Sequence, residues 1–198
     1  MNPFDYANNL RVRSLFSLLF LVVFVCIDCT RFVRKRTVSE ELSPNVERAK
    51  IYLSGHTGEF TKDSEEILTI LRRLIDGTVR KDLTFLPDLV SEEDGIYIDL
   101  KGHWDRARLK TELSAKDNYF RTYFFDREAL EKEKNHSDVR TVRDLLLSSR
   151  GIEVDFYFET PQACEVKFKF KENRKWESEL INPYFTKRKG KWYVHRLF

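Results

Sequence analysis

The residues best suited to acid–base chemistry lie close together near the middle of the chain. Asp99 and His103 flank Lys101 and Gly102, so a carboxylate and an imidazole stand on either side of a short polar connection. Such groups act as a general acid or base only where an apolar pocket holds them and shifts their pKa values. A turn stabilised by local hydrogen bonds explains the same pattern more simply. Asp99 and His103 are therefore the catalytic candidates, weighed against an ordinary turn.

Two tyrosines are the candidates for ligand binding, and no metal site is expected. Tyr97 lies beside the acid–base pair, and Tyr123 lies in a strongly aromatic run. The four histidines are scattered, and no group of residues has the spacing of zinc ligands. We therefore expect neither a metal nor another cofactor. Cys164 falls on the inward face of a predicted strand and is interpreted as a small buried hydrophobic residue.

The C-terminal part of the chain predicts a sheet that positions these residues. Residues 152–171 contain two runs that alternate apolar and polar side chains, which is the period of a strand. Placing Asp155 opposite Lys167 also places Val154 opposite Phe168, so a single antiparallel register satisfies both faces. Asp155 then lies on the polar face, paired across the strands, which argues against a catalytic role.

Two more strands complete a four-stranded antiparallel sheet. Residues 176–187 alternate less cleanly around Pro183, which cannot donate a ladder hydrogen bond, so we expect a bulge or an edge there. Residues 187–190 predict a turn in which Gly190 adopts a positive φ, and residues 191–198 form the last strand.

Helical patterns dominate the region before this sheet. The clearest helix is predicted from Asp63 as its cap to Gly77, because apolar residues recur there at helical spacing. The remaining predictions are a short helix around Pro87, a strand at 96–100, a helix from Asp105 to Ser114, a strand at 119–125, a solvated charged helix or loop at 127–136, and a helix capped by Asp138. The fold class is therefore α+β, with helices packed on a curved antiparallel sheet.

The N-terminus carries an apolar run that predicts contact with a membrane. Residues 15–27 follow two arginines and have no polar face, which is typical of an export signal or an anchor. Cys26 and Cys29 are the lipidation candidates, although neither follows a small residue. Cleavage or lipidation predicts a domain outside the cytoplasm. A retained single span predicts a cytoplasmic domain instead, because more positive charge follows the run than precedes it.

Charge and composition set the expected organisation and exclude one class of partner. The net charge is +3, of which residues 1–37 carry +4, so the folded part has no basic excess and no nucleic-acid partner is expected. We expect a signal or anchor segment at 1–30, a basic and then polar linker at 31–60, and one domain at 61–198. Two basic groups, at 187–191 and 171–175, are either solvated hairpin ends or surfaces that face anionic lipid.

The order of elements is similar to that of a known superfamily. The segment Phe85-Leu-Pro-Asp-Leu-Val-Ser-Glu-Glu-Asp-Gly95, the strand after it and the ending Gly190-Lys-Trp-Tyr-Val194 carry the likeness. From residue 64 to residue 198 the chain resembles the nuclear-transport-factor-like (cystatin-like) superfamily, in which a curved sheet wraps a long helix to form a cone. The whole chain also resembles uncharacterised bacterial putative lipoproteins.

This resemblance implies two functions. Members of the superfamily use the cone as a small-molecule pocket, sometimes with acid–base catalysis, or as a non-catalytic binding surface, and the fold does not decide between them. The inserted segment at 127–149 departs from the usual order and is expected to cover the mouth of the cone. We expect a membrane-tethered, non-enzymatic binding domain of the cell envelope whose ligand is a small molecule or an envelope protein. The alternative is an acid–base enzyme in which Asp99 and His103 act.

Overall fold

The computed structural model describes residues 42–54, 56–57, 60–98 and 102–198, and residues 42–198 form one compact unit. Asp99, Cys26, Cys29 and the apolar run at 15–27 lie outside the described residues. Within the described ranges, no helix has the length and apolarity needed to cross a bilayer. The prediction of a membrane segment is therefore neither confirmed nor contradicted.

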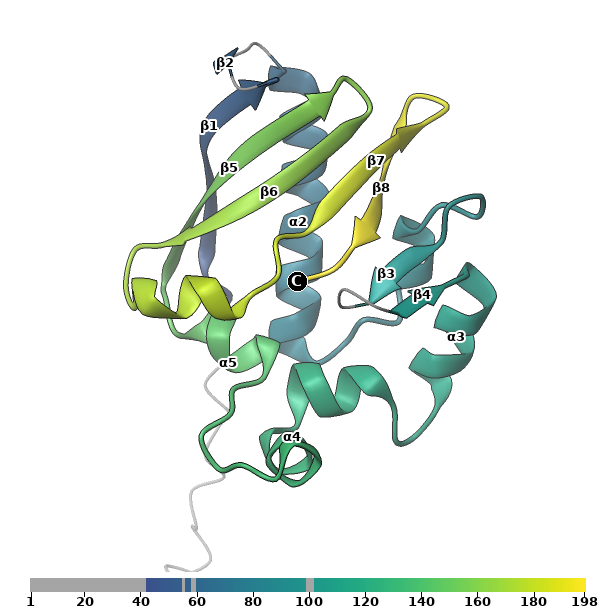
Figure 1. Cartoon of the computed structure of the whole chain (residues 1–198), viewed down its shortest axis with the longest axis vertical. Coiled ribbons are helices and arrows are strands. Elements are labelled where there is room, and N and C mark those ends of the chain that lie inside the picture. The colour runs from purple at the N-terminus through teal and green to yellow at the C-terminus, as the bar shows by residue number, and fades with distance from the viewer. Residues whose placement is uncertain (1–41, 55, 58–59, 99–101) are drawn as a thin grey trace, which may run out of the picture. The chain divides into compact units, whose positions relative to one another are not determined.

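The domain is α+β, with one mixed sheet and several helices (Figure 1). The strands run across the sheet in the order β2-β1-β5-β6-β7-β8-β3-β4. Their bounds are β1 Asn45–Leu53, β2 His56–Thr57, β3 Ile96–Ile98, β4 Gly102–Trp104, β5 Gly151–Thr160, β6 Ala163–Phe170, β7 Tyr184–Arg188 and β8 Lys191–Arg196. The helices are α2 Thr61–Arg80, η1 Leu86–Leu89, α3 Arg106–Ser114, η2 Arg121–Phe125, α4 Arg127–Lys134, α5 Val142–Leu147 and η3 Arg174–Glu179.

The four C-terminal strands confirm the predicted register. Strands β5 to β8 pair antiparallel in sequence order, with Asp155 opposite Lys167 and Val154 opposite Phe168. Lys189 and Gly190 both adopt positive φ at the β7–β8 turn, the conformation in which a two-residue hairpin matches strand twist. The less regular run before Pro183 is the short helix η3 and a loop, so β7 begins only at Tyr184.

The sheet is not purely antiparallel, and the predicted linker was wrong from residue 45 onwards. Strand β1 pairs parallel with β5, and β3 pairs parallel with β8. β1 alternates poorly and carries charged side chains, because much of its length is only partly covered. Its addition makes β5 an interior strand. Asp155 is consequently buried. Its carboxylate accepts a hydrogen bond from the Lys50 amide at 3.1 Å and forms an ion pair with Lys169 at 2.5 Å.

Helix α2 packs on one face of the sheet and passes beyond both predicted ends. Phe60 occupies the N-cap position without a side-chain cap, and Asp63 lies in the first turn with its carboxylate directed at β7 and β8. Gly77 does not end the helix, and glycine is required at this position because Phe85 and the Asp82 carbonyl approach it too closely for a side chain. The helix ends at Arg80, and its C-cap residue Lys81 adopts a left-handed conformation.

Aromatic side chains fill the interior on the α2 side of the sheet. The largest fully buried side chains are Phe120, Phe124, Phe156, Phe158, Phe170, Phe185 and Trp192. Two of them come from residues 119–125, where a strand was predicted and a helical segment ending in η2 is found. Asn118 starts this segment by accepting the Arg121 amide at 2.8 Å. Aromatic strand preference is overridden by packing here.

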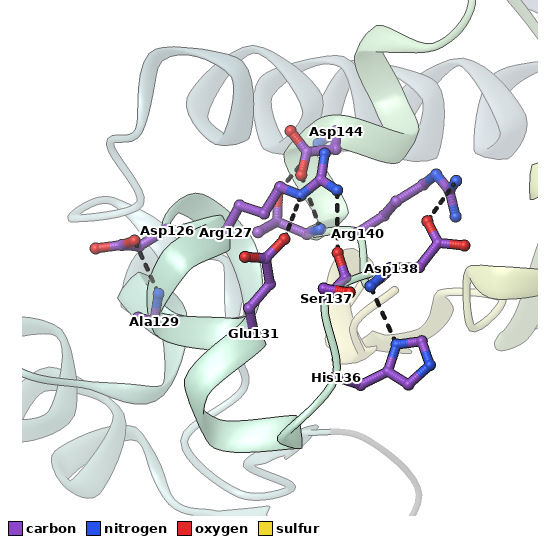
Figure 2. Close-up of polar contacts among 10 residues, drawn as sticks. Asp126, Arg127, Ala129, Glu131, His136, Ser137, Asp138, Arg140 and Asp144 are labelled. Carbon is purple, nitrogen blue, oxygen red and sulfur yellow. Dashed lines mark hydrogen bonds and ion pairs between the residues drawn. The ribbon is translucent and has the colours of Figure 1, made fainter.

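The inserted segment forms two short capped helices joined by a polar connection (Figure 2). Asp126 caps α4 by accepting the Ala129 amide at 3.1 Å, and Arg127 pairs with Glu131 at 3.0 Å. The predicted cap of the next helix, Asp138, was wrong. Thr141 caps α5 instead, in a capping box with Asp144. The Thr141 hydroxyl accepts a hydrogen bond from the Asp144 amide, and the Asp144 carboxylate accepts one from the Thr141 amide.

Candidate functional site

Tyr97, His103, Tyr184 and His195 gather on the face of the sheet opposite α2; we call them the Tyr97 cluster. The Tyr97 ring centre lies 4.8 Å from that of His103 and 5.2 Å from that of His195. The Tyr184 ring centre lies 6.2 Å from that of His195. Four strands, β3, β4, β7 and β8, therefore supply one aromatic and imidazole surface.

Strand alternation places this cluster on the outer face. In β8, Trp192 is buried and bonds Asp63 of α2, whereas His195, an odd number of residues away, is only partly covered. Likewise Tyr97 is 40% exposed between two buried isoleucines of β3. His195 is also skipped in the β7–β8 pairing, where Tyr184 opposes Arg196 and Phe185 opposes Val194. His195 is therefore the extra residue of a β-bulge in β8.

The environment keeps His195 neutral and Tyr184 protonated. Burial lowers the pKa of His195, and the positive charges nearby lower it further against the opposing effect of Asp94. Its Nδ1 is buried with no hydrogen-bond partner among the described residues. Burial, followed by the hydrogen bond to Glu159 at 2.7 Å, raises the pKa of Tyr184 to about 12. His195 and Tyr184 therefore offer uncharged hydrogen-bonding groups at neutral pH.

The segment before β3 holds His103 in place. The His103 Nε2 lies 2.7 Å from the Asp94 carbonyl oxygen, and its ring is exposed. Asp94 itself accepts two hydrogen bonds from Arg188, at 2.7 and 3.0 Å, and these bonds, with the charge of Arg188, hold the pKa of that carboxyl below its usual value. The β7–β8 hairpin thereby anchors the turn that positions His103.

Not every candidate from the sequence joins this surface. Tyr97 and His103 lie together in it, Asp99 lies outside the described residues, and Tyr123 is elsewhere. Tyr123 lies in η2, and its ring stacks on that of Tyr119 with ring centres 4.5 Å apart. The Lys134 ammonium lies 5.1 Å from the centre of the Tyr123 ring. Sequence reasoning missed His195, because the bulge and the parallel β3–β8 pairing that bring it to Tyr97 leave no local pattern.

The arrangement offers contact area and hydrogen bonds. The tyrosine rings supply rigid contact area, and the phenol and imidazole groups supply hydrogen-bonding atoms. In the part of the chain that the structure describes, no three His, Cys, Asp or Glu side chains are placed to hold a metal ion. The chain matches no protein family model, no curated protein and no solved structure.

Gly95 is the residue whose substitution should disturb the site most directly. It has φ of +62°, and an added Cβ would lie 2.5 Å from the Trp104 carbonyl oxygen and 2.8 Å from His103 Nε2. We expect Gly95→Ala to lower the free energy of unfolding by about 1–3 kcal/mol and to shift the NMR signals of the His103 ring.

Gly190→Ala is the matched control, because Gly190 also has positive φ, of +82°, but no atom within 4 Å of an added Cβ. Its cost should be limited to the unfavourable backbone conformation, about 1 kcal/mol, with the His103 signals unchanged. Equal effects of the two substitutions on His103 would show that the close approach at Gly95 does not position the imidazole.

Proposed function

We propose that this chain is a membrane-tethered, non-enzymatic binding domain of the cell envelope that engages its partner through the Tyr97 cluster. The observation that carries the proposal is the exposed Tyr97 ring between His103 and His195, on the face that no described helix covers (Figure 1). The apolar run at 15–27 supports the tether, since a run without a polar face has no place on the surface of a small soluble domain.

The packing inside the domain supports a surface rather than a pocket. The sheet and α2 enclose a core filled with phenylalanine and tryptophan side chains, in the place where a cone-shaped relative would hold a small molecule. His103, the acid–base candidate, lies outside that core with its ring exposed. The cluster lies on an open sheet face, and this favours a protein partner over a small molecule, because small ligands bind in concave sites that bury most of their surface.

Site-specific photo-crosslinking in native membranes tests this proposal. A benzophenone amino acid replaces Tyr97 in the full-length chain, and the matched control replaces Lys110, which is exposed on α3. We expect a discrete adduct from position 97 that is absent at position 110 and is lost when His195→Ala is added. Adducts of equal yield at both positions, or none at position 97, would contradict the assignment of this face.

A further inference from the structure

We infer that a groove on the outer side of α2 binds the headgroups of anionic phospholipids and orients the domain on its membrane. The inference rests on the membrane tether of the proposed function and adds a lipid partner to it. The groove has a volume of about 620 Å³ and is lined by Thr69, Arg72, Arg73, Asp76, Gly77, Arg80, Asp82 and Phe85. We call it the α2 groove.

The arginines of this groove are available to a ligand. Arg73 lies over the Phe85 ring at 4.2 Å, and among the described residues neither Arg73 nor Arg80 forms an ion pair. Arg72 donates from both Nε and Nη2 to the Val46 carbonyl, so the contacts to a ligand are assigned to Arg73 and Arg80. Guanidinium groups in such an array bind phosphate oxygens with two parallel hydrogen bonds.

The carboxylates in the groove do not cancel this charge. The Asp82 carboxylate accepts hydrogen bonds from the Thr84 amide at 3.0 Å and from the Thr84 hydroxyl at 2.7 Å. Asp76 is half-buried. Among the residues that line the groove, three guanidinium groups against two carboxylates leave one excess positive charge.

The two basic groups singled out in the sequence are less suited to lipid. They lie at opposite ends of the sheet. The Lys171 amide donates a hydrogen bond to the Gly151 carbonyl at the start of β5, whereas the Lys187 amide donates one to the Gln162 carbonyl in the turn after β5. At the hairpin tip, the cations 187–189 pair with Asp63, Asp94 and Glu93 in turn. At the other end, Lys169 pairs with Asp155 and Lys171 with Glu47, and Arg174 shares its hollow with Glu153 and Glu177.

The tether reaches the domain beside the α2 groove. Strand β1 begins at Asn45, and the next carbonyl, that of Val46, is the one held by Arg72. Leu42, the first described residue, is 88% exposed at this junction. Residues 28–41 separate the apolar run from Leu42. Even fully extended, a chain of that length reaches no more than about 50 Å, so the tether of the proposed function keeps this end of the domain near the bilayer.

Energy transfer in nanodiscs tests the inference with the full-length chain. Cys26 and Cys29 are replaced by serine, and a donor dye is attached through Leu42→Cys, which is exposed beside the groove but does not line it, or, as a distant reference, through Gln162→Cys. Cys164 is buried, and burial raises the pKa of its thiol, so it does not compete for the dye. The discs contain headgroup-labelled acceptor lipid in phosphatidylcholine, alone or mixed with phosphatidylglycerol.

We expect phosphatidylglycerol to raise transfer from position 42 and not from position 162. Arg73→Gln with Arg80→Gln should lower the ratio of membrane-apposed to free domain about fivefold per arginine, because each basic residue near an anionic surface contributes about that factor. The matched control, Lys110→Gln with Lys116→Gln, removes equal charge from an exposed region around α3 and should leave transfer unchanged.

Three results would overturn the inference. Energy transfer that is the same with and without phosphatidylglycerol would contradict a role of the α2 groove but not the tether. Transfer that falls equally in the control variant would have the same meaning. Loss of transfer in sodium phosphate but not in sodium chloride of equal ionic strength shows that the groove prefers free phosphate. A chain that does not enter the discs contradicts the tether itself, and the inference with it.

Discussion

Trp192→Ala is expected to lower the free energy of unfolding by about 3–5 kcal/mol, the range for deleting a buried aromatic side chain. Trp192 is 1% exposed and packs edge-on against Phe158, with ring centres 5.8 Å apart. Its Nε1 also donates to Asp63 at 2.9 Å, so the substitution removes a tie between β8 and α2. A domain of this size has about 5–15 kcal/mol of stability in all, so the variant should be close to unfolding.

Denaturant titrations of two further variants separate packing from the hydrogen bond. Trp192→Phe keeps most of the buried ring and loses the donor, so we expect a loss of about 1–3 kcal/mol. Trp176→Ala is the control, because Trp176 is only partly buried and lies between the Arg140 and Lys175 side chains. Its loss should be about 1 kcal/mol. Equal losses in all three would contradict the central position of Trp192.

Asp63→Asn is expected to lower stability by about 1–3 kcal/mol at neutral pH and to change its pH dependence. Burial alone would raise the pKa of Asp63, but hydrogen bonds from Lys187 at 2.6 Å and from Trp192 outweigh it, so the pKa is lowered. A lowered pKa in the folded state means that the contribution is complete above the pKa of the unfolded chain. It is lost as the pH falls through the lower, folded value.

The measurement is the free energy of unfolding of both chains between about pH 7 and pH 2. The difference between wild type and Asp63→Asn should be largest near neutrality and should shrink as the carboxyl is protonated. Asp117→Asn, at an exposed ion pair with Arg121, should change stability by no more than about 1 kcal/mol at pH 7. A difference for Asp63 that stays constant down to pH 2 would show that its charge does not join α2 to the hairpin.

The parts of this fold that were predictable are those whose pattern is local. The β5–β6 register follows from alternation on both faces, and the cap of α3 at Asp105 follows from its spacing to Leu109. The aromatic run at 119–125 misled the prediction, because ring packing around Phe124 stabilises a helical segment there. Parallel pairing with distant β5 gives β1 no hairpin signal, and its charged side chains resemble a linker.

The candidate site was half predictable for the same reason. Tyr97 and His103 face each other across the β3–β4 pair, whose residues are close in sequence. His195 joins them through the parallel contact of β3 with β8 and through a bulge, and neither has a signature in the residues themselves. The α2 groove depends on Phe85 and Asp82 folding back over Gly77, so the helical pattern alone could not indicate it.

The central claim is that residues 15–27 tether this domain to a membrane, and carbonate extraction of membranes from cells tests it most directly. We expect the full-length chain to stay in the membrane pellet and a chain lacking residues 15–27 to be released with the soluble proteins. Release of the full-length chain together with the deletion variant would contradict it.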